Sequence, residues 1–75
     1  MTQGLYAVII VYSTSHALQI EKLLLGEGIR CKLIPVPRQI STNCGVCVRI
    51  RRCDREMVLE AITGTQIQIE GIHDI

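Results

Sequence analysis

The chain has 75 residues, a formal net charge of +1 and 48% hydrophobic residues, with no Trp, no Phe and two Tyr. This apolar content excludes a disordered chain and requires an aliphatic core. The length predicts one small domain over residues 1–75. The weak net charge and the scarcity of aromatic rings argue against nucleic-acid binding, because single-strand binders stack bases on such rings.

The longest apolar run, residues 5–12, is much shorter than the roughly 20 residues that cross a bilayer, so we expect no membrane association. No basic leader precedes a longer apolar stretch, which argues against a secretory signal. We therefore expect a cytoplasmic protein with four reduced cysteines. In that setting cysteines more often serve catalysis or metal binding than disulfide bonds.

The first half of the chain predicts a strand followed by a helix. Residues 5–13 begin with a continuous apolar run that is rich in β-branched side chains, which is typical of a strand at the centre of a sheet. The serines and threonine at 13–15 can cap a helix over residues 16–25, where apolar side chains recur at helical spacing. The Gly-Glu-Gly sequence at 26–28 ends this helix.

The second half predicts two strands, a helix and a last strand. Over residues 29–36 the side chains alternate between two faces, and Pro35 indicates an edge strand. After a polar connection, the side chains of residues 46–51 alternate in the same way. Asp54 can cap a helix over residues 55–62 that ends at Gly64, and the alternating residues 66–72 predict the final strand.

The element order βαββαβ predicts an α+β fold of the split βαβ, ferredoxin-like kind, a four-stranded antiparallel sheet with two helices on one face. Right-handed crossovers predict the strand order 4-1-3-2, and we further expect the first and third strands to run parallel. On this arrangement the end of the sheet that bears Cys44 also bears the C-terminal ends of both helices, whose dipoles disfavour an anion.

Cysteines at 31, 44, 47 and 53 suggest a zinc site. However, Cys44 and Cys53 fall at opposite ends of the third strand, about 20–30 Å apart at roughly 3.3 Å per residue. Zinc requires every sulfur about 2.3 Å from the metal, and Cys31 and Cys47 point to opposite faces of the sheet. We therefore expect no metal. We expect Cys31 to be a small, buried hydrophobic residue and Cys53 to have a structural rather than a functional role.

Cys44 and Cys47 also form a C-x-x-C motif. In thioredoxin-like proteins this motif opens a helix, whereas here it opens a strand. An extended backbone would hold the two sulfurs too far apart for a disulfide, while a turn at Gly45 would allow one. A thiol-disulfide switch with Cys47 as resolving thiol therefore stays open.

Cys44 is the candidate working residue because it lies in a loop without apolar periodicity, beside a glycine that lets another backbone or a ligand approach. We expect Arg38 and backbone N–H groups of the loop to stabilise its thiolate. The alternative is an exposed thiol of no consequence.

Three features carry a resemblance to a known family: the opening strand with Tyr12-Ser13-Thr14, the amphipathic helix over residues 17–25, and Val36-Pro37-Arg38 leading through Ser41 to Cys44-Gly45. Over residues 6–51 the chain resembles the selenium/sulfur carrier-like family of small bacterial and archaeal domains. The resemblance implies a thiol carrier with Cys44 as the attachment point. Cys47 departs from the apolar or small residue that is usual in the family at this place.

The resemblance implies a carrier protein rather than a stand-alone enzyme. We expect Cys44 to hold a persulfide or selenopersulfide and to relay it between donor and acceptor proteins of sulfur or selenium trafficking, with no cofactor beyond this transient cargo. A basic open face of the sheet (Arg30, Lys32, Arg49 and Arg51) either docks an acidic partner or is simply solvated. The alternative function is a non-catalytic interaction module that assembles through its sheet, as a homodimer or with a partner.

Overall fold

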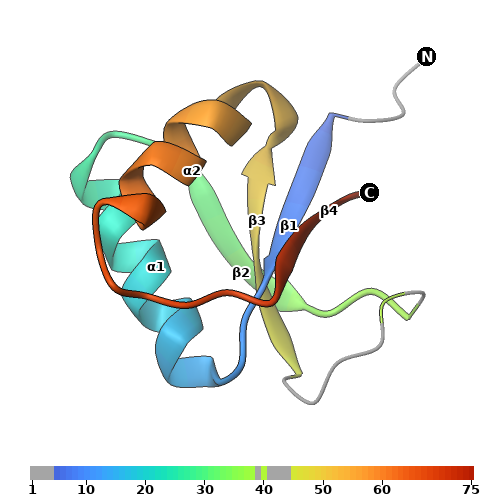
Figure 1. Cartoon of the computed structure of the whole chain (residues 1–75). Helices are drawn as coiled ribbons and strands as arrows, with labels where there is room; N and C mark the ends of the chain where they lie inside the picture. The colour runs from blue at the N-terminus through green and yellow to red at the C-terminus, as the bar shows by residue number, and fades with distance from the viewer. Residues whose placement is uncertain (1–4, 39, 41–44) are drawn as a thin grey trace.

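Four strands and two helices form two layers in the computed structural model, which describes residues 5–38, 40 and 45–75 (Figure 1). The strands pair in the order β2-β3-β1-β4, and each neighbouring pair is antiparallel. The α+β class and the predicted strand order are therefore confirmed. In chain order the elements are β1 (Tyr6–Ile10), α1 (Thr14–Gly26), β2 (Cys31–Pro35), β3 (Val46–Arg51), a short 3-10 turn (Arg52–Asp54), α2 (Arg55–Thr63) and β4 (Gly71–Asp74).

The central strands β1 and β3 run antiparallel, so the prediction of parallel first and third strands is wrong. Tyr6 lies opposite Arg51, and Ile10 lies opposite Cys47. The reason is geometric. Helix α1 returns the chain so that β2 runs in the direction of β1, and β3 then pairs antiparallel with β2. A strand that runs against β2 also runs against β1.

The last strand is shorter and later than its alternation predicts, because β4 spans Gly71–Asp74 and residues 66–70 lie outside it. Ile67 and Ile69 instead pack, half-buried, against the edge of the core. The alternation of apolar residues shows which side chains face the core. It does not show whether their backbone pairs with a neighbouring strand. The first strand is also shorter than predicted, at Tyr6–Ile10.

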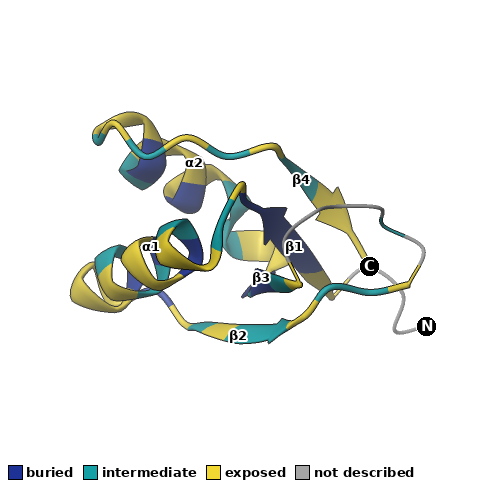
Figure 2. Cartoon of the chain, turned by 90° about the horizontal axis from the view of Figure 1, so that it is seen from below, coloured by how far each residue is buried: buried dark blue, intermediate teal, exposed yellow. Residues whose placement is uncertain are grey.

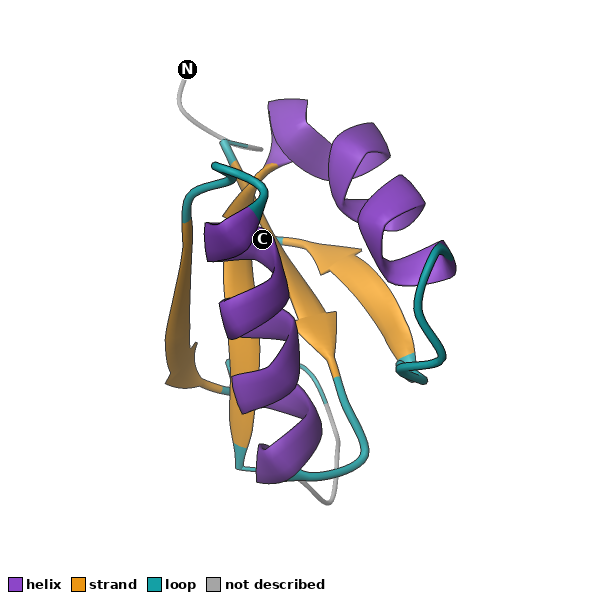
Figure 3. Ribbon diagram, turned by 90° about the vertical axis from the view of Figure 1, so that its left-hand side faces the viewer, coloured by secondary structure: helices purple, strands orange, loops and turns teal. Residues whose placement is uncertain are grey.

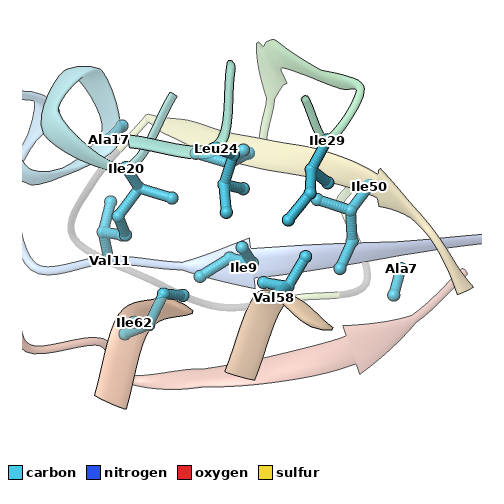
Figure 4. Close-up of a cluster of buried hydrophobic side chains, with 11 residues drawn as sticks. Ala7, Ile9, Val11, Ala17, Ile20, Leu24, Ile29, Ile50, Val58 and Ile62 are labelled. Carbon is cyan, nitrogen blue, oxygen red and sulfur yellow. The ribbon is translucent and has the colours of Figure 1, made fainter. Parts of the chain in front are cut away.

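Both helices cover the same face of the sheet, as predicted (Figure 2). Figure 3 looks onto this helix layer with the strands behind it. Strand β1 is buried on both faces, which confirms its central place. The main core lies between the layers (Figure 4) and contains Ala7, Ile9, Val11, Ala17, Ile20, Leu24, Ile29, Val48, Ile50, Val58 and Ile62.

Helix α1 is capped at both ends by residues of its own sequence. The Ser13 hydroxyl accepts a hydrogen bond from the His16 backbone N–H at 3.4 Å, as its N-cap position predicts. At the other end Gly28 has a φ of +78°. Its N–H donates to the Leu25 carbonyl at 3.1 Å, and the Ile29 N–H donates to the Leu24 carbonyl at 2.9 Å. This is the Schellman arrangement, in which a left-handed residue ends the helix.

Helix α2 is capped less completely, which corrects the expectation for Asp54. Asp54 does stand at the N-cap position, but its side chain makes no capping hydrogen bond. The carboxylate instead faces Arg51, with 3.6 Å between Nε and Oδ2. The start of α2 is tied to β4, because Arg55 donates to Asp74 at 2.8 Å.

Two glycines at the end of α1 should respond oppositely to alanine. Gly28→Ala is expected to lower the free energy of unfolding by about 1 kcal/mol, because a side chain disfavours positive φ. Gly26→Ala should raise it by up to about 1 kcal/mol, since Gly26 lies within the helix and alanine is the better helix former. A Cβ meets no atom within 4 Å at either position, so packing does not confuse the comparison. Urea unfolding measures both values, and a change of the same sign in the two variants contradicts the argument.

Candidate functional site

Cys44, the predicted functional residue, lies outside the described residues, as do Ser41, Thr42 and Asn43. The structure describes the chain that precedes and follows them. The Val36 N–H donates to the Gly45 carbonyl at 3.2 Å and extends the pairing of β2 and β3 by one step. The Ile40 N–H donates to the Pro37 carbonyl at 3.0 Å and closes a turn. Exposed Arg38 lies within this turn. The structure thus brings Arg38 and Gly45 to the same end of the sheet.

That end of the sheet bears the N-terminus of α1, which corrects the prediction that both helices end there. Helix α1 begins four residues after β1 ends at Ile10, and Ile10 lies opposite Cys47 near the start of β3. The error follows directly from the assumed direction of β3. Only α2 runs toward this end with its C-terminus. The dipole of α1 therefore favours an anion at this end of the sheet, and that of α2 disfavours one. The prediction had both helix dipoles disfavouring an anion there.

Part of the connection between β2 and β3 packs onto the face of the sheet away from the helices (Figure 2). Val36 and Ile40 are half-buried there against Val8, Ile10 and Cys47, which are almost completely buried. Ile34 completes this second, smaller cluster. The apolar end of the open face is thus covered by the chain's own connection.

Cys47 belongs to the second cluster, with 0% of its surface exposed. Its thiol lies 4.0 Å from the Pro35 carbonyl oxygen, to which it donates. A resolving thiol must meet the sulfur that it resolves, and Cys44 lies outside the described residues. The role of Cys47 as resolving thiol stays a prediction.

Cys31 and Cys53 occupy different surroundings. Cys31 points to the helix face, as predicted, and its thiol donates to the Glu21 carbonyl at 3.7 Å. Burial raises the pKa of the Cys31 thiol above its ordinary value, and the charge of Glu21 raises it further. Cys53 is exposed in the 3-10 turn, and its thiol lies 3.8 Å from the Asp54 carboxylate.

No group of three or more His, Cys, Asp or Glu side chains that could hold a metal ion occurs among residues 5–38, 40 and 45–75. Cys31 and Cys47 lie on opposite faces of the sheet, in separate clusters. These two thiols therefore cannot bind one zinc ion, in keeping with the sequence argument.

The other end of the open face is basic. Lys32, Arg49 and Arg51 lie on the face of β2 and β3 away from the helices, and Arg30 directly precedes β2. The Arg49 guanidinium lies over the Tyr6 ring, 4.4 Å from its centroid. Sequence reasoning found the four basic residues but missed Tyr6. The alternation of Tyr6, Val8 and Ile10 along the first strand would have placed the ring on this face.

Comparison with known protein families gives a match over most of the chain. A family described as “Putative Se/S carrier protein-like” matches residues 6–74. The chain belongs to this family. The match runs through β4 and so extends beyond the residues that carry the resemblance in the sequence.

No curated protein and no solved structure matches the chain. The assignment to the ferredoxin-like class therefore stays a prediction, while the α+β class and the strand order are those of the structure itself. Neither α1 nor α2, in the part of the chain that the structure describes, has the length and apolar character to cross a membrane.

Proposed function

We propose that Cys44 carries sulfur or selenium as a persulfide or selenopersulfide and relays it between partner proteins. The observation that carries this proposal is membership of the carrier-like family across residues 6–74, a span that includes Cys44. The surroundings of two other cysteines support it by contrast. Cys47 is fully buried, and burial disfavours the thiolate of Cys31.

Loading is a transfer between sulfur atoms without net oxidation. The Cys44 thiolate attacks the outer sulfur of a donor persulfide, R–S–SH, and a new S–S bond forms. The donor's S–S bond breaks, and the donor leaves as the thiolate R–S⁻ with the bonding electron pair. Cys44 is then Cys44–S–SH. Replacing the outer sulfur by selenium gives Cys44–S–SeH in the same way.

Delivery reverses these roles. A nucleophile of the acceptor attacks the outer sulfur or selenium, and Cys44 leaves as a thiolate that is ready for another cycle. The sulfur or selenium is cargo rather than a resident cofactor. The partners are accordingly the donor and acceptor proteins of sulfur or selenium trafficking, and the chain acts as a carrier between them.

Arg38 and Gly45 assist this exchange. Arg38 stabilises the thiolate electrostatically, which increases the fraction of the reactive form at neutral pH. Gly45 has no side chain, which leaves room for a partner surface close to Cys44. Support for both roles comes from the Val36–Gly45 hydrogen bond and the Pro37–Ile40 turn, which hold Arg38 and Gly45 at one end of the sheet.

Incubation with a cysteine desulfurase and cysteine, followed by intact-mass measurement, tests the proposal. We expect the wild-type chain to gain the mass of one sulfur atom and Cys44→Ser to gain none. Cys53→Ser is the matched control and should load fully, because it removes an exposed thiol elsewhere in the fold. Arg38→Gln should load more slowly but reach the same extent. Equal sulfur addition in wild type and Cys44→Ser contradicts the proposal.

A further inference from the structure

A hollow of about 170 Å³ lies on the basic end of the open face. Cys31 of β2 and Ile50 of β3, which lie opposite each other in the sheet with their side chains toward the helices, also line it. The side chains around it are those of Tyr6, Arg30, Lys32, Arg49 and Arg51. Four of these five side chains are cationic, and no carboxylate of the described residues lines the hollow.

The charges around this hollow are largely uncompensated. Arg51 lies 3.6 Å from Asp54, whereas Arg30, Lys32 and Arg49 make no ion pair within residues 5–38, 40 and 45–75. Lys32 stands directly opposite Arg49 in the pairing of β2 and β3. Like charges at directly opposed positions destabilise a sheet. The arrangement therefore weakens the fold, and a bound anion between these strands relieves that repulsion.

Arg49 is also held in place before any ligand arrives. Its guanidinium lies over the Tyr6 ring at 4.4 Å, and the residue is half-buried. A cation held on an aromatic face has less rotamer freedom to lose on binding, which favours affinity. A basic surface that is merely solvated does not require such an orientation.

We propose that this hollow binds an oxyanion of the phosphate type, either free or as the phosphate group of a small molecule. Guanidinium groups match tetrahedral oxyanions because their N–H donors form a planar fork. The volume is below the roughly 300–1,000 Å³ of sites for drug-sized ligands, which suits a compact anion.

The anion site is separate from the proposed carrier site. Arg49 and Arg51 lie four and six residues beyond Gly45 along β3, or about 13–20 Å at the rise of a strand. Anion binding in this hollow therefore does not depend on the proposed chemistry of Cys44. A Cys44→Ser variant is expected to bind the anion as the wild type does.

Pyrophosphate titration of the full chain, followed by 1H–15N NMR, tests the proposal. We expect saturable shifts of backbone amides confined to Tyr6, residues 30–32 and residues 49–51. Lys32→Gln should weaken binding about tenfold, the equivalent of one charge-assisted contact, and it leaves the Arg49–Tyr6 stack in place. Lys22→Gln removes an exposed cation of α1, in the other layer, and should bind as wild type does.

Thermal unfolding gives a second readout that does not depend on the NMR assignment. Pyrophosphate should raise the Tm of the wild type and of Lys22→Gln, because a ligand that binds the folded state stabilises it. It should raise the Tm of Lys32→Gln much less. Without pyrophosphate, Lys32→Gln should be at least as stable as the wild type, since it removes a like-charge pair.

Three results would overturn the proposal. The first is that sodium chloride at matched ionic strength reproduces the shifts, which shows general screening. The second is that Lys22→Gln and Lys32→Gln weaken binding equally. The third is that an acidic peptide or a single-stranded oligonucleotide shifts the same amides and pyrophosphate fails to displace it, which assigns the face to a macromolecule.

Discussion

Replacing Leu24 with Ala is expected to lower the free energy of unfolding by about 2–5 kcal/mol. Leu24 is completely buried in the cluster between the helices and the sheet (Figure 4). The shorter side chain loses its transfer free energy and leaves a cavity that the rigid surroundings fill only in part. A domain of 75 residues has a total stability of about 4–11 kcal/mol, so this single change removes a large fraction of it.

The matched control is the next residue, Leu25, which is 57% exposed on the same helix. Leu25→Ala should change the free energy of unfolding by no more than about 0.5 kcal/mol, because little apolar surface is lost and alanine favours the helix. Urea unfolding monitored by far-UV circular dichroism measures both variants. Similar losses at Leu24 and Leu25 contradict the assigned orientation of α1.

The sequence patterns predicted the faces of the elements well. Alternation over residues 46–51 set Val48 and Ile50 on the opposite face from Cys47 and Arg49. The structure has the first two toward the helices and the other two away from them. Glycine and serine marked the ends of α1 because only certain residues suit positive φ or accept a capping hydrogen bond. These features are local, so the chain near each residue determines them.

The direction and length of the strands were harder to predict from the sequence. The direction of β3 follows from its hairpin with β2, not from its own residues, and the wrong direction misplaced the N-terminus of α1. Ile67 and Ile69 alternate like a strand, yet they pack on the core edge without belonging to β4. Alternation reveals which side is buried, whereas pairing depends on a partner strand far away in the sequence.

The open face of the sheet has two different ends, and this division separates the two proposals. At the start of β3, Val36 and Ile40 cover an apolar cluster, and the connection that contains Cys44 joins the sheet. At the end of β3, the face is basic and hollowed around Tyr6. The sequence showed both the apolar and the basic residues, but it could not show that the connection covers the apolar ones. That depends on contacts between residues far apart in the chain.

Cys47 should react with iodoacetamide at least about 100-fold more slowly than Cys53 in the native protein. Cys47 is fully buried under Val36 and Ile40, whereas Cys53 is exposed. A buried thiol reacts only in the open state, and an opening free energy of about 3 kcal/mol leaves that state populated at less than about 1%. Alkylation followed by digestion and peptide mass spectrometry gives the rate at each cysteine, and the unfolded chain supplies the reference rates.

Ile40→Ala sharpens this measurement, because Ile40 packs against the cluster that contains Cys47 and not against the core on the helix face. The variant should increase the alkylation rate of Cys47 several-fold and leave that of Cys31 unchanged. If Cys47 already reacts in the wild type as fast as Cys53, the cover opens freely. Slow alkylation of Cys47 instead supports its burial in the native chain.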